Sequence, residues 1–348
     1  MRTNSSTSSS ESAVVAFAAV LAVLLVPYEL LVRRSEAIYG VRRSNVVMPL
    51  SLSPKIDALV SDLAAGERYP TYVIGTSRVE EGVRSDVIDA VAGPTFNLAM
   101  SGASSLTGLE VIETLKLRPS LIVVGVSPMD FTDMSMRRGA VAVRGAHDSI
   151  VSFGRPDLAE RGPAATARAA TYALLHGASP SRRRNLGQWL DLLRLRGDLL
   201  KYINNADAVA AQEDVWVRGF SGVPRISTPA QFRELQPANI TSEYLDGHAP
   251  LYAQLQSAVA RQRARGTQVV FVRLPLAPEP RAIEDATGFD GDIRALAARC
   301  GVRYIDGRTL VSDAFIHDRR NFVDGGHLNV SGATQFSRAL AAALRASH

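Results

Sequence analysis

Cysteine is almost absent from this 348-residue sequence, which has only Cys300. A single thiol excludes an internal disulfide framework and any metal site built from several cysteines. The six histidines are scattered, and no two of them have the spacing of a helical zinc motif. The sequence therefore predicts no metal and no other cofactor. We expect Cys300 to be a buried structural thiol in a helix.

Lysine is also scarce, since it occurs only at positions 55, 116 and 201, so the net charge of +5 comes almost wholly from arginine. The arginines are spread along the chain in short clusters such as 182–184, and few aromatic residues lie among them. A nucleic-acid-binding surface needs a concentrated basic stripe, usually with aromatic side chains for stacking. The pattern argues against nucleic acid as a partner.

Long apolar runs are missing except near the start of the chain. Residues 13–26 are continuously apolar, and the run resumes at 30–32 after Pro27, Tyr28 and Glu29. With this extension it reaches the roughly 20 residues that a bilayer-spanning helix needs. We interpret it as an N-terminal transmembrane helix.

The remaining segments have the order that is expected of a membrane-anchored protein. We assign a polar tail to residues 1–12, a single membrane anchor to 13–32, a juxtamembrane linker and helix to 33–66, and a soluble domain to 67–348. A cleaved signal peptide and a buried core helix are the alternatives. The arginines directly after the span, with no small-x-small site close by, argue against cleavage.

The charges beside the span give its orientation under the positive-inside rule. Four arginines follow the span within residues 33–43, whereas only Arg2 precedes it. This rule alone would place the large domain in the cytoplasm.

Beyond the linker, short apolar runs alternate with amphipathic stretches. The pattern predicts strands at 72–75, 96–100, 121–126, 268–274 and 302–305, and helices at 54–65, 83–91, 106–117, 249–265, 293–300 and 331–344. Successive strands joined by helices pair in parallel through right-handed crossovers. The predicted fold class is α/β, a three-layer α/β/α sandwich with a parallel sheet, preceded by the N-terminal transmembrane helix.

The segment at about 134–248 interrupts this alternation. It combines an arginine-rich and glycine-rich opening, a predicted helix at 186–203 and a loop with three prolines. We interpret it as a lid or a substrate-shaping insertion. A helical layer covering one face of the sheet is the alternative.

Polar residues follow the first three predicted strands, where an open parallel sheet binds its ligands. Ser77 comes first, after the run Tyr72-Val73-Ile74-Gly75-Thr76. A strand-to-helix turn would lift its hydroxyl clear of the sheet edge, as a nucleophile requires. Taken alone, a serine in such a turn is as well explained as a helix cap.

Asp324 and His327 stand three apart in a glycine-containing stretch before the last predicted helix. A serine nucleophile needs a base within hydrogen-bond reach and a carboxylate that fixes the tautomer of that base. The glycines between the two residues would let the loop bring them together. A surface cap or a simple turn is the alternative interpretation of this pair.

The combination of these motifs resembles the SGNH hydrolase superfamily, also called GDSL-like. Gly75-Thr76-Ser77 follows the first strand, Gly102 follows the second, and Asp324-x-x-His327 precedes the last helix. The resemblance implies that Ser77 is the nucleophile, His327 the general base and then acid, and Asp324 the orienting carboxylate. It also implies an oxyanion hole from backbone N–H groups near Ser77 and at Gly102.

The third motif departs from the family pattern. That pattern carries an asparagine after the third strand, whereas this chain has Ser127-Pro128-Met129-Asp130. The Ser127 hydroxyl is a candidate replacement donor, although a rotating hydroxyl is less preorganised than an amide. Asp130 could bind substrate or cap the following segment. Arg78 could contact an anionic group of the substrate, or it could simply be an exposed residue in the first turn of a helix.

Within the superfamily, the anchor and the first motif are similar to membrane-tethered proteins that handle acyl groups on cell-envelope polymers. The resemblance implies an esterase or O-acyltransferase that acts on an acylated glycan or envelope polymer beside a polytopic acyltransferase partner. It also implies that the soluble domain lies outside the cytoplasmic membrane, against the arginine distribution. The rival hypothesis is a catalytically silent domain that binds glycan or scaffolds an envelope complex.

Overall fold

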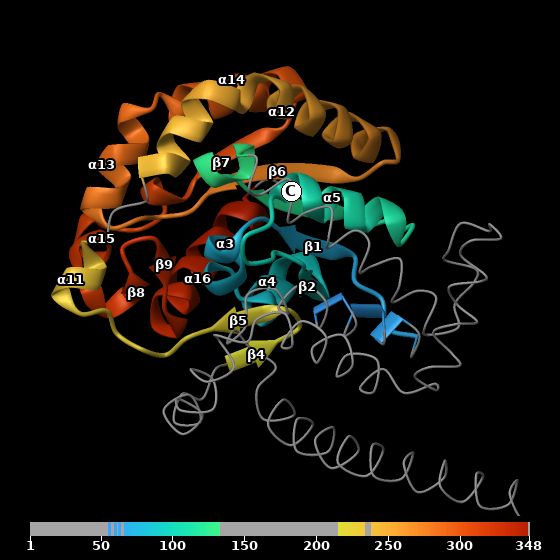
Figure 1. The fold of residues 1–348 in the computed structure, drawn as a ribbon. Helices are drawn as coiled ribbons and strands as arrows, with labels where there is room; N and C mark the ends of the chain where they lie inside the picture. Colours follow the sequence, from blue (N-terminus) through green and yellow to red (C-terminus); the bar gives the residue numbers. More distant parts are fainter. Residues whose placement is uncertain are drawn as a thin grey trace, which may run out of the picture.

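The computed structural model describes residues 55–56, 59–60, 62–63, 66–132, 215–233 and 238–346 (Figure 1). The predicted polar tail, the predicted anchor at 13–32 and most of the predicted insertion lie outside these residues. Within the described ranges, no helix is long and apolar enough to cross a membrane.

A five-stranded parallel sheet forms the centre of the domain. Its strands are β1 (Thr71–Ile74), β2 (Thr95–Asn97), β3 (Leu121–Gly125), β6 (Gln268–Arg273) and β7 (Arg303–Asp306), in the spatial order β2-β1-β3-β6-β7. Every neighbouring pair in this sheet is parallel. The predicted α/β class with a parallel sheet is confirmed, and the strands are those that the apolar runs indicated.

Helices cover both faces of the sheet, as Figure 1 shows. One face packs against α5 (Ser105–Thr114), α12 (Ala238–Ala264) and α14 (Phe289–Cys300), and the other against α4 (Ser85–Ala92) and α16 (Val330–Arg345). Side chains of β3 alternate between the two cores, because Ile122 and Val124 face the first and Val123 faces the second. Cys300 is buried at the end of α14.

Smaller elements complete the described part of the chain. They are α3 (Ser77–Gly82), η2 (Pro128–Phe131), β4 (Val215–Val217), β5 (Phe220–Gly222), α11 (Pro229–Phe232), α13 (Pro278–Ala286), η3 (Gly307–Thr309), α15 (Asp313–His317), η4 (Arg319–Asn321), β8 (Phe322–Asp324) and β9 (His327–Leu328). The hairpin β4–β5 packs on α3, and α11 packs on β8. Helix α12 begins at Ala238, so the insertion boundary placed near residue 248 falls inside it.

Two glycines let α3 approach the ends of two strands. A Cβ on Gly75 would lie 2.5 Å from Cγ2 of Val79, and a Cβ on Gly125 would lie 2.1 Å from the same atom. Gly75 also has φ +151°, a conformation that L side chains rarely adopt. The absence of a side chain at the ends of β1 and β3 therefore leaves room for the helix that begins at Ser77.

We expect Gly125→Ala to lower the free energy of unfolding by about 1–3 kcal/mol, because the new methyl group collides with a buried valine. Gly291→Ala is the matched control, since no atom lies within 4 Å of the Cβ position there. That change should leave stability unchanged or raise it by up to about 1 kcal/mol, because alanine favours the helix. Urea unfolding of both variants measures the difference, and equal effects would contradict the close packing of α3.

Candidate active site

Ser77 is the first residue of α3, at the carboxyl end of β1. Thr76 occupies the N-cap position, so Ser77 is not the helix cap. The Ser77 hydroxyl oxygen lies 2.8 Å from Nε2 of His327, although the two residues are 250 positions apart. The hydroxyl is half-buried and within hydrogen-bond reach of a base, which is the geometry that a serine nucleophile needs.

His327 is hydrogen-bonded through its other ring nitrogen to Asp324. Nδ1 lies 2.9 Å from Oδ1 and 3.0 Å from Oδ2 of that carboxylate. Oδ1 also accepts hydrogen bonds from the backbone N–H groups of Gly326 and His327, at 2.7 and 2.9 Å. The carboxylate thus holds the ring so that Nε2 points at Ser77.

A small hairpin explains how Asp324 and His327 converge. They face each other as directly paired residues of β8 and β9, joined through Gly325 and Gly326. Residues directly opposite in an antiparallel pair project to the same face. The sequence pattern predicted the convergence from a flexible glycine loop, whereas the structure obtains it from cross-strand pairing.

The hairpin is held by residues 223–233, which the sequence assigned to the insertion. The N–H of Gly325 donates to the carbonyl of Gln231 at 2.8 Å, and the N–H of Ser227 donates to the carbonyl of Phe322 at 2.8 Å. The N–H of Val330 donates to the carbonyl of Val223 at 3.0 Å. This part of the middle segment therefore braces the strands that carry Asp324 and His327.

The charges around His327 favour its protonated form. Burial alone would lower the pKa of the imidazole, but the carboxylates of Glu81 and Asp324 outweigh burial and the opposing Arg78, and raise it to about 8. Burial opposes ionisation of Asp324, yet its hydrogen bonds and the His327 charge hold its pKa below the usual range. Sequence reasoning missed Glu81, which lies one helical turn after Ser77 on the same face of α3.

Gly102 lies in the turn that follows the second strand. Beyond β2, the N–H of Met100 donates to the carbonyl of Gly75 at 3.0 Å, so this segment runs beside the turn that precedes Ser77. Gly102 is buried with φ +71°, and its N–H has no backbone acceptor among the described residues. Its role as a backbone donor of the oxyanion hole, which the resemblance implies, stays a prediction.

Ser127 and Asp130 are engaged with each other after β3. The Ser127 hydroxyl and N–H both donate to Oδ2 of Asp130 at 2.8 Å, while Oδ1 accepts from the N–H of Ser105 at 2.6 Å. Asp130 is buried, and this burial raises its pKa to about 6. Asp130 thus caps the start of η2 and the start of α5 rather than the segment after Phe131, and the Ser127 hydroxyl is bound to its carboxylate.

Arg78 follows Ser77 but is not exposed. Its side chain is buried and pairs through Nη1 with Oε1 of Glu284 at 2.5 Å. Oε2 of the same glutamate pairs with Arg273 at 3.2 Å. Arg78 therefore belongs to a buried group of charges beside the candidate nucleophile.

Asn97 is a second residue that sequence reasoning missed. Its amide nitrogen donates to the carbonyls of Val79 and Val83 at 3.0 and 2.7 Å, and its oxygen accepts from the N–H of Ala99 at 3.0 Å. It is fully buried at the end of β2 and holds the last turn of α3. A lone asparagine within the apolar run at 96–100 was the available signal.

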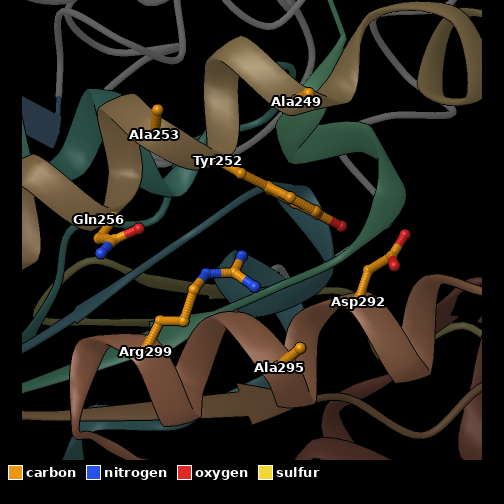
Figure 2. Close-up of a pocket in the computed structure, with 7 residues that line it drawn as sticks. All are labelled: Ala249, Tyr252, Ala253, Gln256, Asp292, Ala295 and Arg299. Carbon is orange, nitrogen blue, oxygen red and sulfur yellow. The ribbon is translucent and has the colours of Figure 1, made fainter.

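One cavity of the described structure lies elsewhere. It encloses about 250 Å³ between α12 and α14, and Figure 2 shows its polar lining by Tyr252, Gln256, Asp292 and Arg299. None of the residues predicted from the sequence lines it. In the described part of the chain, no group of three or more His, Cys, Asp or Glu side chains could hold a metal ion.

Comparisons with known proteins give little further information. No protein-family model matches the chain. No curated protein matches it either. A crystal structure of a provisionally named acylhydrolase from Bacteroides fragilis aligns with a TM-score of 0.35 and 10% identity, over 82% of this chain and 94% of that one. A likeness at this level carries no argument about activity, so the case for the site depends on its own geometry.

The raised pKa of His327 can be measured directly. We expect the ring to titrate near pH 8 by NMR, and Asp324→Asn and Glu81→Gln each to lower that pKa, because each removes a negative charge that favours the imidazolium. Arg78→Gln should raise it. The resonance is assigned by its loss in His327→Gln. A His327 pKa at or below 6.5 in the unmodified protein would contradict this electrostatic arrangement.

Proposed function

We propose that this protein is a serine-dependent acyl hydrolase or acyltransferase of the SGNH type. The observation that carries the proposal is the continuous hydrogen-bonded chain from Ser77 through His327 to Asp324. The three side chains are supplied by elements at the carboxyl end of the parallel sheet, and the five strands have the flavodoxin-like order 2-1-3-4-5. Nucleophile, base and orienting carboxylate thus occupy the positions that acyl transfer requires.

The chemistry proceeds in two steps. Ser77 Oγ attacks the ester carbonyl carbon while its proton moves to Nε2 of His327, and Asp324 stabilises the imidazolium that forms. His327 then returns the proton to the leaving alcohol as the carbon–oxygen bond breaks, which leaves an acyl-serine. Water or a sugar hydroxyl then attacks this acyl group while its proton moves to His327, and His327 passes that proton to Ser77 Oγ as the acyl–serine bond breaks. Water gives hydrolysis, and a sugar hydroxyl gives acyl transfer.

The proposal extends to the setting of the reaction. Under it, residues 13–32 tether the protein to the cytoplasmic membrane, and the domain acts outside it on acyl esters of envelope glycans or polymers. A polytopic acyltransferase would supply or accept the acyl group. The support is the apolar N-terminal run together with the sequence motifs.

A silent binding domain is the second candidate. The observation in its favour is that the Ser127 hydroxyl is committed to Asp130, which removes one side-chain donor from the expected oxyanion hole. Loss of one such donor typically costs on the order of 100- to 1,000-fold in turnover. Under this reading the protein would bind an acylated glycan without forming an acyl-enzyme.

The nucleophile is tested with a fluorophosphonate probe and a short-chain ester. We expect the intact protein to be labelled, and Ser77→Ala to lose both labelling and hydrolysis, because the substitution removes the hydroxyl that is hydrogen-bonded to His327. Ser257→Ala is the control, since that hydroxyl is exposed on α12 and only bonds its own helix backbone. Labelling that survives in Ser77→Ala would exclude this nucleophile, and a folded protein that never labels would favour the silent domain.

The membrane placement is tested with a reporter fused after His348. We expect alkaline phosphatase, which folds only in an oxidising compartment, to be active on the full-length chain and inactive when residues 1–32 are deleted. Activity of a cytoplasmic reporter at the same position would instead follow the arginine distribution and exclude an extracytoplasmic domain.

A further inference from the structure

The buried arginines beside Ser77 differ in how many carboxylates each of them contacts. Arg78 and Arg273 are 3% and 1% exposed, and the carboxylate that they share, Glu284, is 4% exposed. Arg273 has two further partners, Asp285 and Asp290, whose side chains are 41% and 28% exposed. Arg78 has only Glu284 among the described residues.

Two nitrogen atoms of Arg78 have no acceptor for their N–H groups. Its Nε and Nη2 atoms are buried and have no hydrogen-bond partner. A buried polar group without a partner costs about 1–3 kcal/mol, and more when it is charged. The Nε of Arg273 is also unpartnered, but its two terminal nitrogens contact three carboxylates. A guanidinium that contacts a single carboxylate and has two nitrogens without hydrogen-bond partners is therefore the exception in this cluster.

The sheet order shows which strand ends the Arg78–Glu284 ion pair spans. Arg78 begins at the end of β1, and Glu284 belongs to α13, which follows β6. In the sheet, β3 lies between β1 and β6. An ion pair that joins the elements after β1 and β6 must therefore cross the carboxyl end of β3. The next residue, Val79, indeed packs against Gly125 at that end.

The same place lies beside the reacting atoms. Arg78 adjoins Ser77 in the first turn of α3, and its charge partly opposes the rise that Glu81 and Asp324 cause in the pKa of His327. When Ser77 Oγ bonds to an ester carbonyl carbon, the carbonyl electron pair moves to oxygen and a full negative charge develops there. Fixed donors in a dry site stabilise such a charge best.

We propose that Arg78 is a catalytic residue whose free N–H groups donate hydrogen bonds to the oxyanion formed on the acyl group attached to Ser77. It moves no proton: His327 holds the serine proton, and Arg78 stabilises the oxygen until the carbonyl reforms. This supplies the side-chain donor that Ser127 does not offer, because that hydroxyl is bound to Asp130. The inference rests on the proposed function and assigns one further residue to the same site.

The test separates catalysis from structure with Arg78→Gln and Arg78→Met. In both variants Glu284 still pairs with Arg273. Because the substitutions also remove buried donors that have no hydrogen-bond partner, we expect the melting temperature to stay unchanged or rise. For p-nitrophenyl acetate, kcat should fall by about 100- to 1,000-fold with little change in KM. Arg78→Lys should recover only part of kcat, because a point charge replaces a planar fork.

Arg308→Gln is the matched control. Arg308 is an arginine of the same cluster that pairs with Asp285, Asp290 and Asp306 but not with Glu284. Its loss should lower the melting temperature and change kcat by less than about threefold.

Two results would overturn the inference. One is an Arg78→Gln protein with a lowered melting temperature and undiminished kcat, which would make Arg78 structural. The other is a loss confined to KM for an anionic ester such as 4-acetoxybenzoate and absent for its methyl ester, which would make Arg78 a binding site for substrate charge. If the wild-type protein is neither labelled by the probe nor able to hydrolyse the ester, both the proposed function and this inference fail. If the wild-type protein is active and Arg78→Gln has the same kcat, only this inference fails.

Discussion

The arrangement of this site depends on the close approach of α3 to the ends of β1 and β3. Val79 lies where any Cβ on Gly75 or Gly125 would be, so the helix can sit there only over bare backbone. That contact fixes the direction in which Ser77 leaves the sheet. The hydrogen bond to His327, contributed from 250 residues away, then requires the last hairpin to dock against the same short helix.

A six-residue helix has too few internal hydrogen bonds to be stable alone, and here buried polar partners hold it. Asn97 binds the carbonyls of its last turn, Glu80 pairs with the buried Lys55 at 2.8 Å, and Arg78 pairs with Glu284. Buried pairs add little net stability because desolvation offsets their attraction. They do specify one position, since a displaced helix would leave several buried charges without partners.

Much of the fold was predictable because the parallel strands are buried on both faces and stand out as apolar runs. The strands at 121–126 and 268–274 were placed within one residue, and α16 likewise. The helix predicted at 83–91 corresponds to α4, and α3 is the separate helix expected to begin at the turn that carries Ser77. The sequence pattern does not predict α13, because Pro275 and Pro278 indicate only the end of the preceding strand. Proline at the first turn of a helix is compatible with either reading.

The sequence by itself determined which residues could do the chemistry: a serine after the first strand, an aspartate and a histidine before the last helix, and a sheet whose carboxyl edge collects them. Only the tertiary structure decided how they meet. Cross-strand pairing of Asp324 with His327, the burial of Arg78 against Glu284 and the capture of Ser127 by Asp130 are contacts between segments distant in the chain or set by a local turn. A spacing of three residues is compatible with the Asp324–His327 and Ser127–Asp130 contacts, whereas the Arg78–Glu284 contact joins residues 206 positions apart and follows only from packing.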